Sequence, residues 1–439
     1  MNKPQFGELK MIVRFGRRLV LRILQIYLIV LIPVLLVIVI VIRVVKKTPA
    51  DFKQRRVVLG GAGLVNHAKW CGALRAEDIE SKTFVWGAPE IYDQRTFDYD
   101  LQAKWGKFVY LVVPWIFLKT LFGTDTVICG FDGFLLGTTN LRRFELYFMK
   151  LAKCKIVVVP YGADSFVYRN IDSRATAHVL QISYPQASRN QNRIERDVRR
   201  NVKNADFMFL GFMTFDGFGR WDALPVSPLV IDLDVWQPNK EIHKTREKLT
   251  IVHTPNHRGF KGTEFLIQAV KELQEENYAV ELVLLEEIPN SEVLKIFVER
   301  ADVLVEQLIA PGYALSAIEG MATGLTVVSN LSDQGVIAPM RRWSYLNECP
   351  IVSATPETIK EVLVKLINQP QLREELSTLS RMYAEKYHSY QTFQEFYQAI
   401  DAYLYEQGPD LINFYHPIIG QSRTVHKKLK TPLVSNEIV

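Results

Sequence analysis

Short apolar runs alternate with longer amphipathic segments along most of the chain. The runs have the composition and length of strands buried on both faces, whereas the segments repeat apolar residues at the spacing of one helical face. The predicted strands cover residues 57–59, 84–86, 126–129, 155–159, 206–210, 249–253, 280–285, 303–305, 325–328 and 351–352. The predicted helices cover residues 101–122, 141–152, 262–274, 291–300, 314–323, 356–367, 371–387 and 392–405. This alternation predicts an α/β fold with parallel sheets.

The alternation runs twice along the chain. Residues 225–238 hold three prolines and no helix signal, and they separate the two series. We therefore expect two Rossmann-like domains that face each other across a cleft. The first is predicted over residues 57–234, and the second over residues 235–407 with a closing helix. A loop-like tail is predicted over residues 408–439.

An uncharged segment, residues 23–42, precedes the two domains and is long enough to span a bilayer as a helix. Six Lys or Arg residues lie before it, in the basic segment 1–22, and six more lie over residues 43–56. The positive-inside rule therefore selects no orientation. Two arrangements stay open: a single span, and a re-entrant segment that bends at Pro33. In both, we expect the catalytic domains on the cytoplasmic side.

The net charge of +6 is unevenly spread, because the first 56 residues hold twelve Lys or Arg and two acidic residues. These basic residues flank an apolar segment, which indicates a membrane surface and not a nucleic acid. A second basic run, residues 189–203, is compatible with anionic lipid or with a solvated helix face. The four cysteines have neither disulfide nor metal-site spacing, which fits a reducing compartment.

One stretch of the second half, residues 303–329, has the pattern of a strand, a loop, a helix and a strand. A glycine-containing loop that leads into a helix directs free backbone N–H groups at one point, which favours a phosphate. Glu319 follows one turn later, where a carboxylate suits the hydroxyl groups of a ribose. The alternative is an ordinary βαβ unit with a solvated glutamate. The residues expected to offer donor-binding N–H groups are Gly312, Tyr313, Ala314 and Leu315.

Two cations lie between a predicted strand and a predicted helix at the start of the second half. Arg258 and Lys261 are three residues apart. A departing diphosphate needs positive charge, which Arg supplies as a two-pronged donor and Lys as a point charge. We expect both to stabilise the diphosphate without a metal; the alternative is two surface cations.

The first half offers a glycine-rich turn and several polar strand ends. Gly61 and Gly63 follow the first strand and would let the backbone approach the donor or the acceptor, or form a turn without a ligand; the dinucleotide fingerprint is absent. Ligands bind at the carboxyl ends of strands in open α/β sheets. Asp164 is therefore our acceptor-side candidate, with Tyr161 and Asp132 as alternatives.

Three segments together resemble the GT-B glycosyltransferases, specifically the family 4 (group 1) type of polysaccharide biosynthesis. Residues 232–238 resemble the interdomain segment of that family, residues 258–263 its diphosphate-binding Arg and Lys, and residues 312–328 its donor-binding signature. The resemblance is best over residues 225–405. The second Glu of the family's acidic pair holds the ribose, and that role maps onto Glu319.

The chain departs from the family pattern at three points. Pro311 stands where the first Glu of the pair is expected, and Tyr161 stands where an acceptor-side His is common. The spacing from Arg258 to Lys261 is also short. The first two departures concern catalysis more than donor binding.

The resemblance implies a membrane-anchored transferase that moves a sugar from a nucleotide diphosphate sugar to a lipid-linked or polysaccharide acceptor. It implies retention of the anomeric configuration and no metal or other cofactor. Two Asp-x-Asp strings, residues 98–100 and 232–234, are the alternative metal signal. Two other functions stay open: a catalytically silent subunit that supports a partner transferase, which Pro311 favours, and a nucleotide-sugar epimerase.

Overall fold

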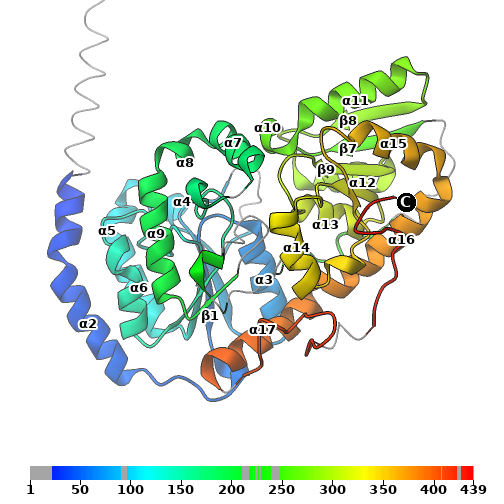
Figure 1. Cartoon of the computed structure of the whole chain (residues 1–439). Helices are drawn as coiled ribbons and strands as arrows, with labels where there is room; N and C mark the ends of the chain where they lie inside the picture. The colour runs from blue at the N-terminus through cyan, green and yellow to red at the C-terminus, as the bar shows by residue number, and fades with distance from the viewer. Residues whose placement is uncertain are drawn as a thin grey trace, which may run out of the picture.

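Two α/β units, each built on a parallel sheet, lie side by side in a computed structural model of the chain (Figure 1). The structure describes residues 22–89, 96–171, 173–209, 217–220, 222, 226, 229–238, 248–406, 408–422 and 427–438.

The first sheet has six parallel strands in the order β3-β2-β1-β4-β5-β6. This is the strand order of a dinucleotide-binding Rossmann fold, in which the order reverses between the first and fourth strands. β1 pairs with β2 on one side and with β4 on the other. The strands are β1 (Val57–Gly61), β2 (Ser81–Val85), β3 (Tyr99–Asp100), β4 (Thr126–Cys129), β5 (Lys155–Val158) and β6 (Phe207–Met208).

The second sheet has five parallel strands in the order β11-β10-β9-β7-β8. Numbered from its own first strand, this is the flavodoxin-like order, and its reversal point lies between β7 and β9. The strands are β7 (Leu249–His253), β8 (Val280–Leu284), β9 (Val303–Gln307), β10 (Thr326–Ser329) and β11 (Val352–Ser353).

Helices cover both faces of each sheet, as parallel strands require. In the first unit these are α3 (Val65–Arg75), α4 (Leu101–Trp105), α5 (Val109–Phe122), α6 (Arg142–Leu151), α7 (Arg174–Ser183), α8 (Pro185–Arg189) and α9 (Gln191–Asn204). The helices of the second unit are α10 (Arg258–Lys261), α11 (Thr263–Glu275), α12 (Asn290–Glu299), α13 (Leu315–Ala322), α14 (Gln334–Trp343), α15 (Ile359–Asn368) and α16 (Pro370–Tyr387). Short 3₁₀ turns occupy Phe52–Gln54, Gly106–Phe108, Tyr168–Asn170, Gly217–Gly219 and Leu346–Glu348.

The last helix, α17 (Tyr390–Tyr405), follows the second unit but packs on α3 of the first (Figure 1). Phe393 stacks on Trp70 with ring centroids 5.3 Å apart. Asp401 forms a buried ion pair with Arg55, just before β1. The same apolar core therefore contains side chains from both sheets and from α17.

The predicted strands given above occur with ends shifted by a few positions, and residue 210, the predicted end of one of them, lies outside the described residues. The predicted helix over residues 101–122 is broken at Gly106, whose φ of 49° suits glycine. One face of this helical region is exposed, so the apolar composition of residues 101–122 does not reflect a fully buried helix. The tail is more ordered than predicted: the backbone of Asn436 accepts a hydrogen bond from Ser353 at the end of β11.

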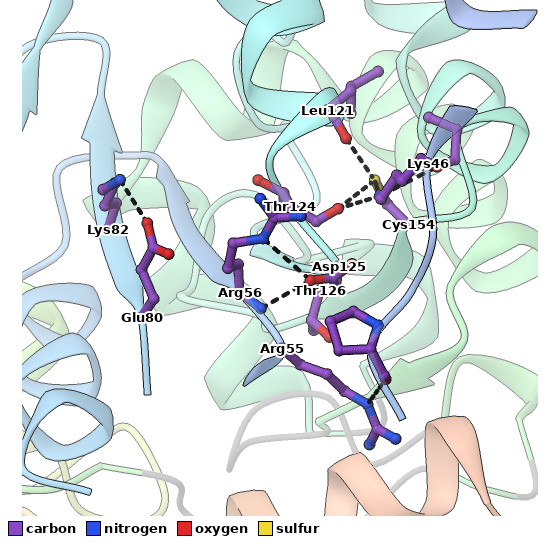
Figure 2. Close-up of polar contacts among 12 residues, drawn as sticks. Lys46, Arg55, Arg56, Glu80, Lys82, Leu121, Thr124, Asp125, Thr126 and Cys154 are labelled. Carbon is purple, nitrogen blue, oxygen red and sulfur yellow. Dashed lines mark hydrogen bonds and ion pairs between the residues drawn. The ribbon is translucent and has the colours of Figure 1, made fainter. Parts of the chain in front are cut away.

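The N-terminal apolar segment packs on the first unit. Helix α2 (Ile32–Val45) lies against α5 and α6, with Leu35 and Val39 buried (Figure 1). Just beyond it, the buried amine of Lys46 donates to backbone oxygens that include that of Thr124 and lies 3.2 Å from the Cys154 sulfur (Figure 2).

By length and composition, Leu101–Phe122 could cross a membrane, and the pair Arg22–Val30 and Ile32–Val45, bent by 44°, could form another span or a re-entrant loop. The break between the two helices lies two residues before Pro33, the residue at which one of the two open arrangements bends. Whether this segment enters a membrane stays a prediction.

Candidate functional site

Segments that follow the carboxyl ends of both sheets meet between the two units. Helix α7 contacts α10, where the Tyr184 ring lies edge-on to His257 with centroids 4.5 Å apart. Helix α3 meets α13 through an ion pair between Lys69 and Glu319. Because ligands of open α/β sheets bind at such strand ends, this junction is the candidate site.

The loop between β9 and α13 is held by side chains of the neighbouring strand ends. The Gln307 amide donates to the carbonyls of Ala310 and Gly312, and the Ser329 hydroxyl donates to Gly312 at 2.6 Å. Asn330 donates to the carbonyls of Leu308 and Ile309. Gly312 has a φ of 97°, which only glycine adopts without strain. The loop therefore has a fixed shape before any ligand binds.

The predicted donor-binding backbone divides into two parts. The N–H of Gly312 donates to the Asn330 carbonyl at 2.8 Å, and the Tyr313 side chain is buried with its hydroxyl 3.1 Å from His388. By contrast, Ala314 caps α13 with no side-chain hydrogen bond. Among the described residues, the first turn that begins at Leu315 thus has no side-chain acceptor at its cap, which leaves its N–H groups available as an anion site requires.

Lys261 lies beneath this loop and is 5% exposed. Its amine pairs with the Glu306 carboxylate and lies 2.9 Å from the Gln307 side-chain oxygen. Glu306 also accepts from the hydroxyls of Ser316 and Ser329. The predicted diphosphate-binding lysine therefore already has a buried anionic partner.

Sequence reasoning missed Glu306. It is the fourth residue of β9, a five-residue strand in which every residue is buried. An acidic residue within such an apolar run is unusual and could have marked the position.

Arg258 does not share the partners of Lys261. Its guanidinium donates to Glu264 at 2.8 Å and to Glu286 at 2.9 Å, both in the second unit, and its side chain is exposed. The structure thus leaves the joint role of Arg258 and Lys261 as a prediction, with Lys261 the more central of the two.

Glu319 is buried and pairs with Lys69 at 3.3 Å across the junction. Burial raises the pKa of Glu319, and the amine of Lys69 opposes that shift. Burial also lowers the pKa of Lys69, which Glu319 opposes. Neither side chain is a solvated surface group, so the glutamate is not solvated as the alternative reading expected. Contact of Glu319 with a ribose stays a prediction.

The predicted donor-side glycines of the first unit lie in close backbone packing. A side-chain carbon at Gly61 would come within 2.2 Å of the Gly133 carbonyl oxygen, and one at Gly63 within 2.7 Å of Pro89. Gly61 also has a φ of 94°. This packing accounts for both glycines without a ligand, and their contact with donor or acceptor stays a prediction.

Asp164 fastens two loops of the first unit. Its carboxylate accepts backbone N–H groups from Phe131 at 3.0 Å, Tyr161 at 3.1 Å and Gly162 at 3.0 Å. Burial and the neighbouring Asp132 raise its pKa above the usual range, and these three N–H groups oppose the shift.

Asp132 is placed differently from Asp164. One of its oxygens accepts from the Tyr161 hydroxyl at 2.7 Å, and the other has no hydrogen-bond partner among the described residues. Of the two carboxylates, Asp132 has the greater capacity to bind a ligand hydroxyl.

Aspartates of both Asp-x-Asp strings accept hydrogen bonds from neighbouring residues of the chain. Asp98 accepts from Thr83 and Arg75, and Asp100 caps α4. Asp232 accepts the N–H of Asp234. The described residues contain no group of three or more His, Cys, Asp or Glu that could hold a metal ion.

No family model matches the chain, and no curated protein matches it either. Among solved structures, it is similar to a sucrose-phosphate synthase from Thermosynechococcus elongatus, at 13% identity and a TM-score of 0.52 over 79% of this chain and 100% of that one. Anabaena HepE in complex with UDP-glucose aligns at 12% identity and a TM-score of 0.49, over 79% and 99%. A putative UDP-N-acetylglucosamine 2-epimerase from Listeria monocytogenes aligns at 11% identity and a TM-score of 0.46, over 81% and 98%.

Identity this low shows a shared fold and nothing finer. Helices that follow the carboxyl ends of two parallel Rossmann-like sheets meet at the junction, and the final helix returns to the first unit. Together with the match to the synthase, these features show that the chain has the GT-B fold.

Proposed function

We propose that this protein is a membrane-associated glycosyltransferase that moves a sugar from a nucleotide diphosphate sugar to a lipid-linked or polysaccharide acceptor. One observation carries the proposal. The open N-terminus of α13, the amine of Lys261 on α10 and the carboxylate of Glu319 all adjoin one loop at the reversal point of the second sheet.

Glycosyl transfer breaks the bond from the anomeric carbon to the diphosphate oxygen while an acceptor oxygen bonds to that carbon. Negative charge grows on the diphosphate as it leaves. The first-turn N–H groups of α13 and the amine of Lys261 would stabilise that charge, with Arg258 as an outer cation. The pairing of Lys261 with Glu306 keeps the amine in place before the donor arrives.

The ribose would bind at Glu319, whose two oxygens suit neighbouring hydroxyl groups. Lys69 holds that carboxylate in the present structure, so the donor would displace or share this ion pair. Such an exchange would couple donor binding to the contact between α3 and α13. If donor binding tightened this contact, the two units would close over the site. Closure would exclude water as a competing acceptor.

On the acceptor side, Asp132 is the better-supported group. One oxygen of its carboxylate, beside Tyr161, is unpaired among the described residues and buried, and it would accept a hydrogen bond from an acceptor hydroxyl once movement of the site exposes it. Asp164 would instead hold the loops that carry both residues. The proposal also includes retention of the anomeric configuration and catalysis without a metal, because the resemblance to family 4 glycosyltransferases implies both.

A catalytically silent subunit is the second candidate. Pro311 in place of an acidic residue, together with the two occupied ion pairs, Lys261 with Glu306 and Lys69 with Glu319, favours it. Such a subunit would bind nucleotide sugar or lipid and support a partner transferase.

Sugar transfer from labelled nucleotide sugars in membranes that contain the full chain separates the candidates. We expect transfer with one donor, a loss of about a hundredfold in Lys261→Ala and Glu319→Ala, and no loss in the surface control Lys271→Ala. Equal transfer by all variants would refute the site. No transfer from any donor by the wild type would favour the silent subunit.

A further inference from the structure

The first unit has a cavity of about 420 Å³ between its sheet and α4 and α5. Its apolar lining includes Val58, Phe84, Leu101 and Ile116. It reaches Thr124, which lies before β4, and so extends to the amino ends of the strands. The proposed donor site lies at the carboxyl ends, so this cavity is a separate place on the molecule.

Basic side chains outnumber acidic ones around the cavity. The four cations are Arg56, Lys82, Lys104 and Lys119, and the two acids are Glu80 and Asp100. Both acids are engaged: Asp100 accepts the N–H groups of Ala88 and Ala103, and Glu80 pairs with Lys82 (Figure 2).

The pairing leaves positive charge at the cavity. Lys104 and Lys119 have no carboxylate within 4.0 Å in the described part of the chain. Arg56 is 3.5 Å from the buried Asp125 and is 34% exposed (Figure 2). The site therefore combines apolar walls with a net excess of cations, which suits a ligand that is both apolar and anionic.

An exposed apolar surface adjoins the cavity. Phe108, Leu111, Trp115 and Phe122 on or beside α5 are 67%, 37%, 45% and 52% exposed. Three of them, Leu111, Trp115 and Phe122, share α5 with the cavity residues Ile116 and Lys119, and Phe108 lies just before it.

Helix α2 extends this surface. Its outer residues, such as Val37 at 60% exposed and Val41 at 55%, continue the apolar face beside α5. The Trp115 indole donates to the Tyr27 hydroxyl at 3.3 Å, which ties α5 to the helical segment Arg22–Val30 that precedes α2. The N-terminal segment is thus part of the first unit's surface and not a free stalk.

From these contacts we infer that the cavity binds the headgroup of one anionic phospholipid from a bilayer that covers α2 and α5. The phosphate would lie among Lys82, Lys104 and Lys119, and the acyl chains would run onto the aromatic face of α5. Aromatic side chains and lysines together are typical of a membrane interface with anionic lipid. The inference rests on the proposed membrane association and not on donor binding.

Flotation of the purified full chain with vesicles tests this site. The vesicles are phosphatidylcholine alone, and phosphatidylcholine with phosphatidylglycerol. We expect the wild type to bind both and to prefer the anionic vesicles, and we expect Lys82→Gln/Lys119→Gln to lose roughly 30-fold of that preference. The control Lys107→Gln/Lys150→Gln removes the same charge from exposed positions outside the cavity lining and should lose much less.

Other outcomes overturn the inference. Equal losses in both double variants would mean diffuse attraction and no site. Protection of the wild type against heat by inorganic phosphate, lost in Lys82→Gln/Lys119→Gln, would mean a soluble anion and not a lipid.

Two further results separate this inference from the proposed function. A wild type that binds both vesicles equally would refute the headgroup site but leave the membrane association intact, whereas a wild type that binds neither would refute both. Nucleotide binding by Lys82→Gln/Lys119→Gln should match the wild type, since the donor site is elsewhere.

Discussion

Buried ion pairs dominate the candidate site at the scale of single residues. The positions of Glu319 and Lys261 could be predicted from the sequence because each follows a strand and a loop with a recognisable pattern. Their partners could not, since Lys69 is 250 positions from Glu319 and Glu306 is 45 from Lys261. The first pairing depends on how the two units meet, and the second on how α10 packs beside β9 within the second unit. Local sequence patterns contain neither.

Lys69→Met should destabilise the protein near neutral pH. The change leaves the buried carboxylate of Glu319 without its cation, which costs about 3–5 kcal/mol. Burial then raises the pKa of Glu319 further, so the loss should shrink as the pH falls and the carboxyl group takes up a proton. Denaturant unfolding at several pH values measures this. Lys69→Met/Glu319→Gln should recover most of the loss; an unchanged single variant would mean that the ion pair does not form.

Asp132→Asn and Asp164→Asn should separate catalysis from loop structure. Asp164→Asn replaces one acceptor oxygen with a donor that faces a backbone N–H, so we expect a loss of about 1–3 kcal/mol in the free energy of unfolding. Asp132→Asn should fold normally and lose sugar transfer at least tenfold. Melting curves and transfer assays on the same preparations check both. The reverse pattern would make Asp164 the acceptor-side group.

The elements themselves follow the sequence pattern closely, and the exceptions have physical causes. Strands β4 and β7 occur at the predicted bounds because continuous β-branched runs have few alternatives. α3 was missed because its buried face includes the polar His67 and its sequence contains Gly72, and α14 because it contains Pro339. The contact of α2 with α5 could not be predicted from the sequence, because an apolar segment of this length has the same pattern whether it packs on a protein or lies in a bilayer.

Val39→Asn and Val37→Asn test whether α2 packs on the first unit. Both are valines of one helix, but Val39 is fully buried and Val37 is 60% exposed. An asparagine at position 39 would leave a cavity and an unpaired amide, so we expect a loss of about 2–4 kcal/mol. Position 37 should tolerate the change. Thermal unfolding of the full chain in detergent measures both, and equal stability of the two variants would show that α2 is a free helix.

At the scale of the whole molecule, the chain passes from the first unit to the second after residues 229–238 and returns after His388. Residues of the first passage contact His388 directly. Its backbone oxygen accepts the N–H of Ile231, and its ring lies 2.7 Å from the Leu229 carbonyl. The other ring nitrogen lies 3.1 Å from the hydroxyl of Tyr313, in the donor loop. His388 therefore connects the segment that joins the two units to the proposed donor site. The sequence predicts the crossing over residues 225–238, but neither the return of α17 to the first unit nor the residue that contacts both passages.

Acid should weaken this connection. Burial lowers the pKa of His388 to about 4 from 6.5, so between those values the unfolded chain binds a proton that the folded chain does not. The free energy of unfolding should therefore fall as the pH falls, by about 1.4 kcal/mol per unit for this residue. His388→Gln should be less stable at pH 7 but show a shallower slope from pH 6.5 to 4. An unchanged slope would mean that His388 is not buried in its neutral form.

Binding of nucleotides to the full chain tests the central claim most directly. A panel of UDP, GDP, ADP and CMP is measured by thermal shift and then by calorimetry, with Glu319→Gln and the exposed control Glu292→Gln. We predict that one nucleoside diphosphate raises the melting temperature of the wild type and of Glu292→Gln, and that Glu319→Gln weakens its binding at least tenfold. Binding that is equally tight in Glu319→Gln, or absent from the wild type for every nucleotide, would contradict the claim that this junction is a nucleotide-sugar site.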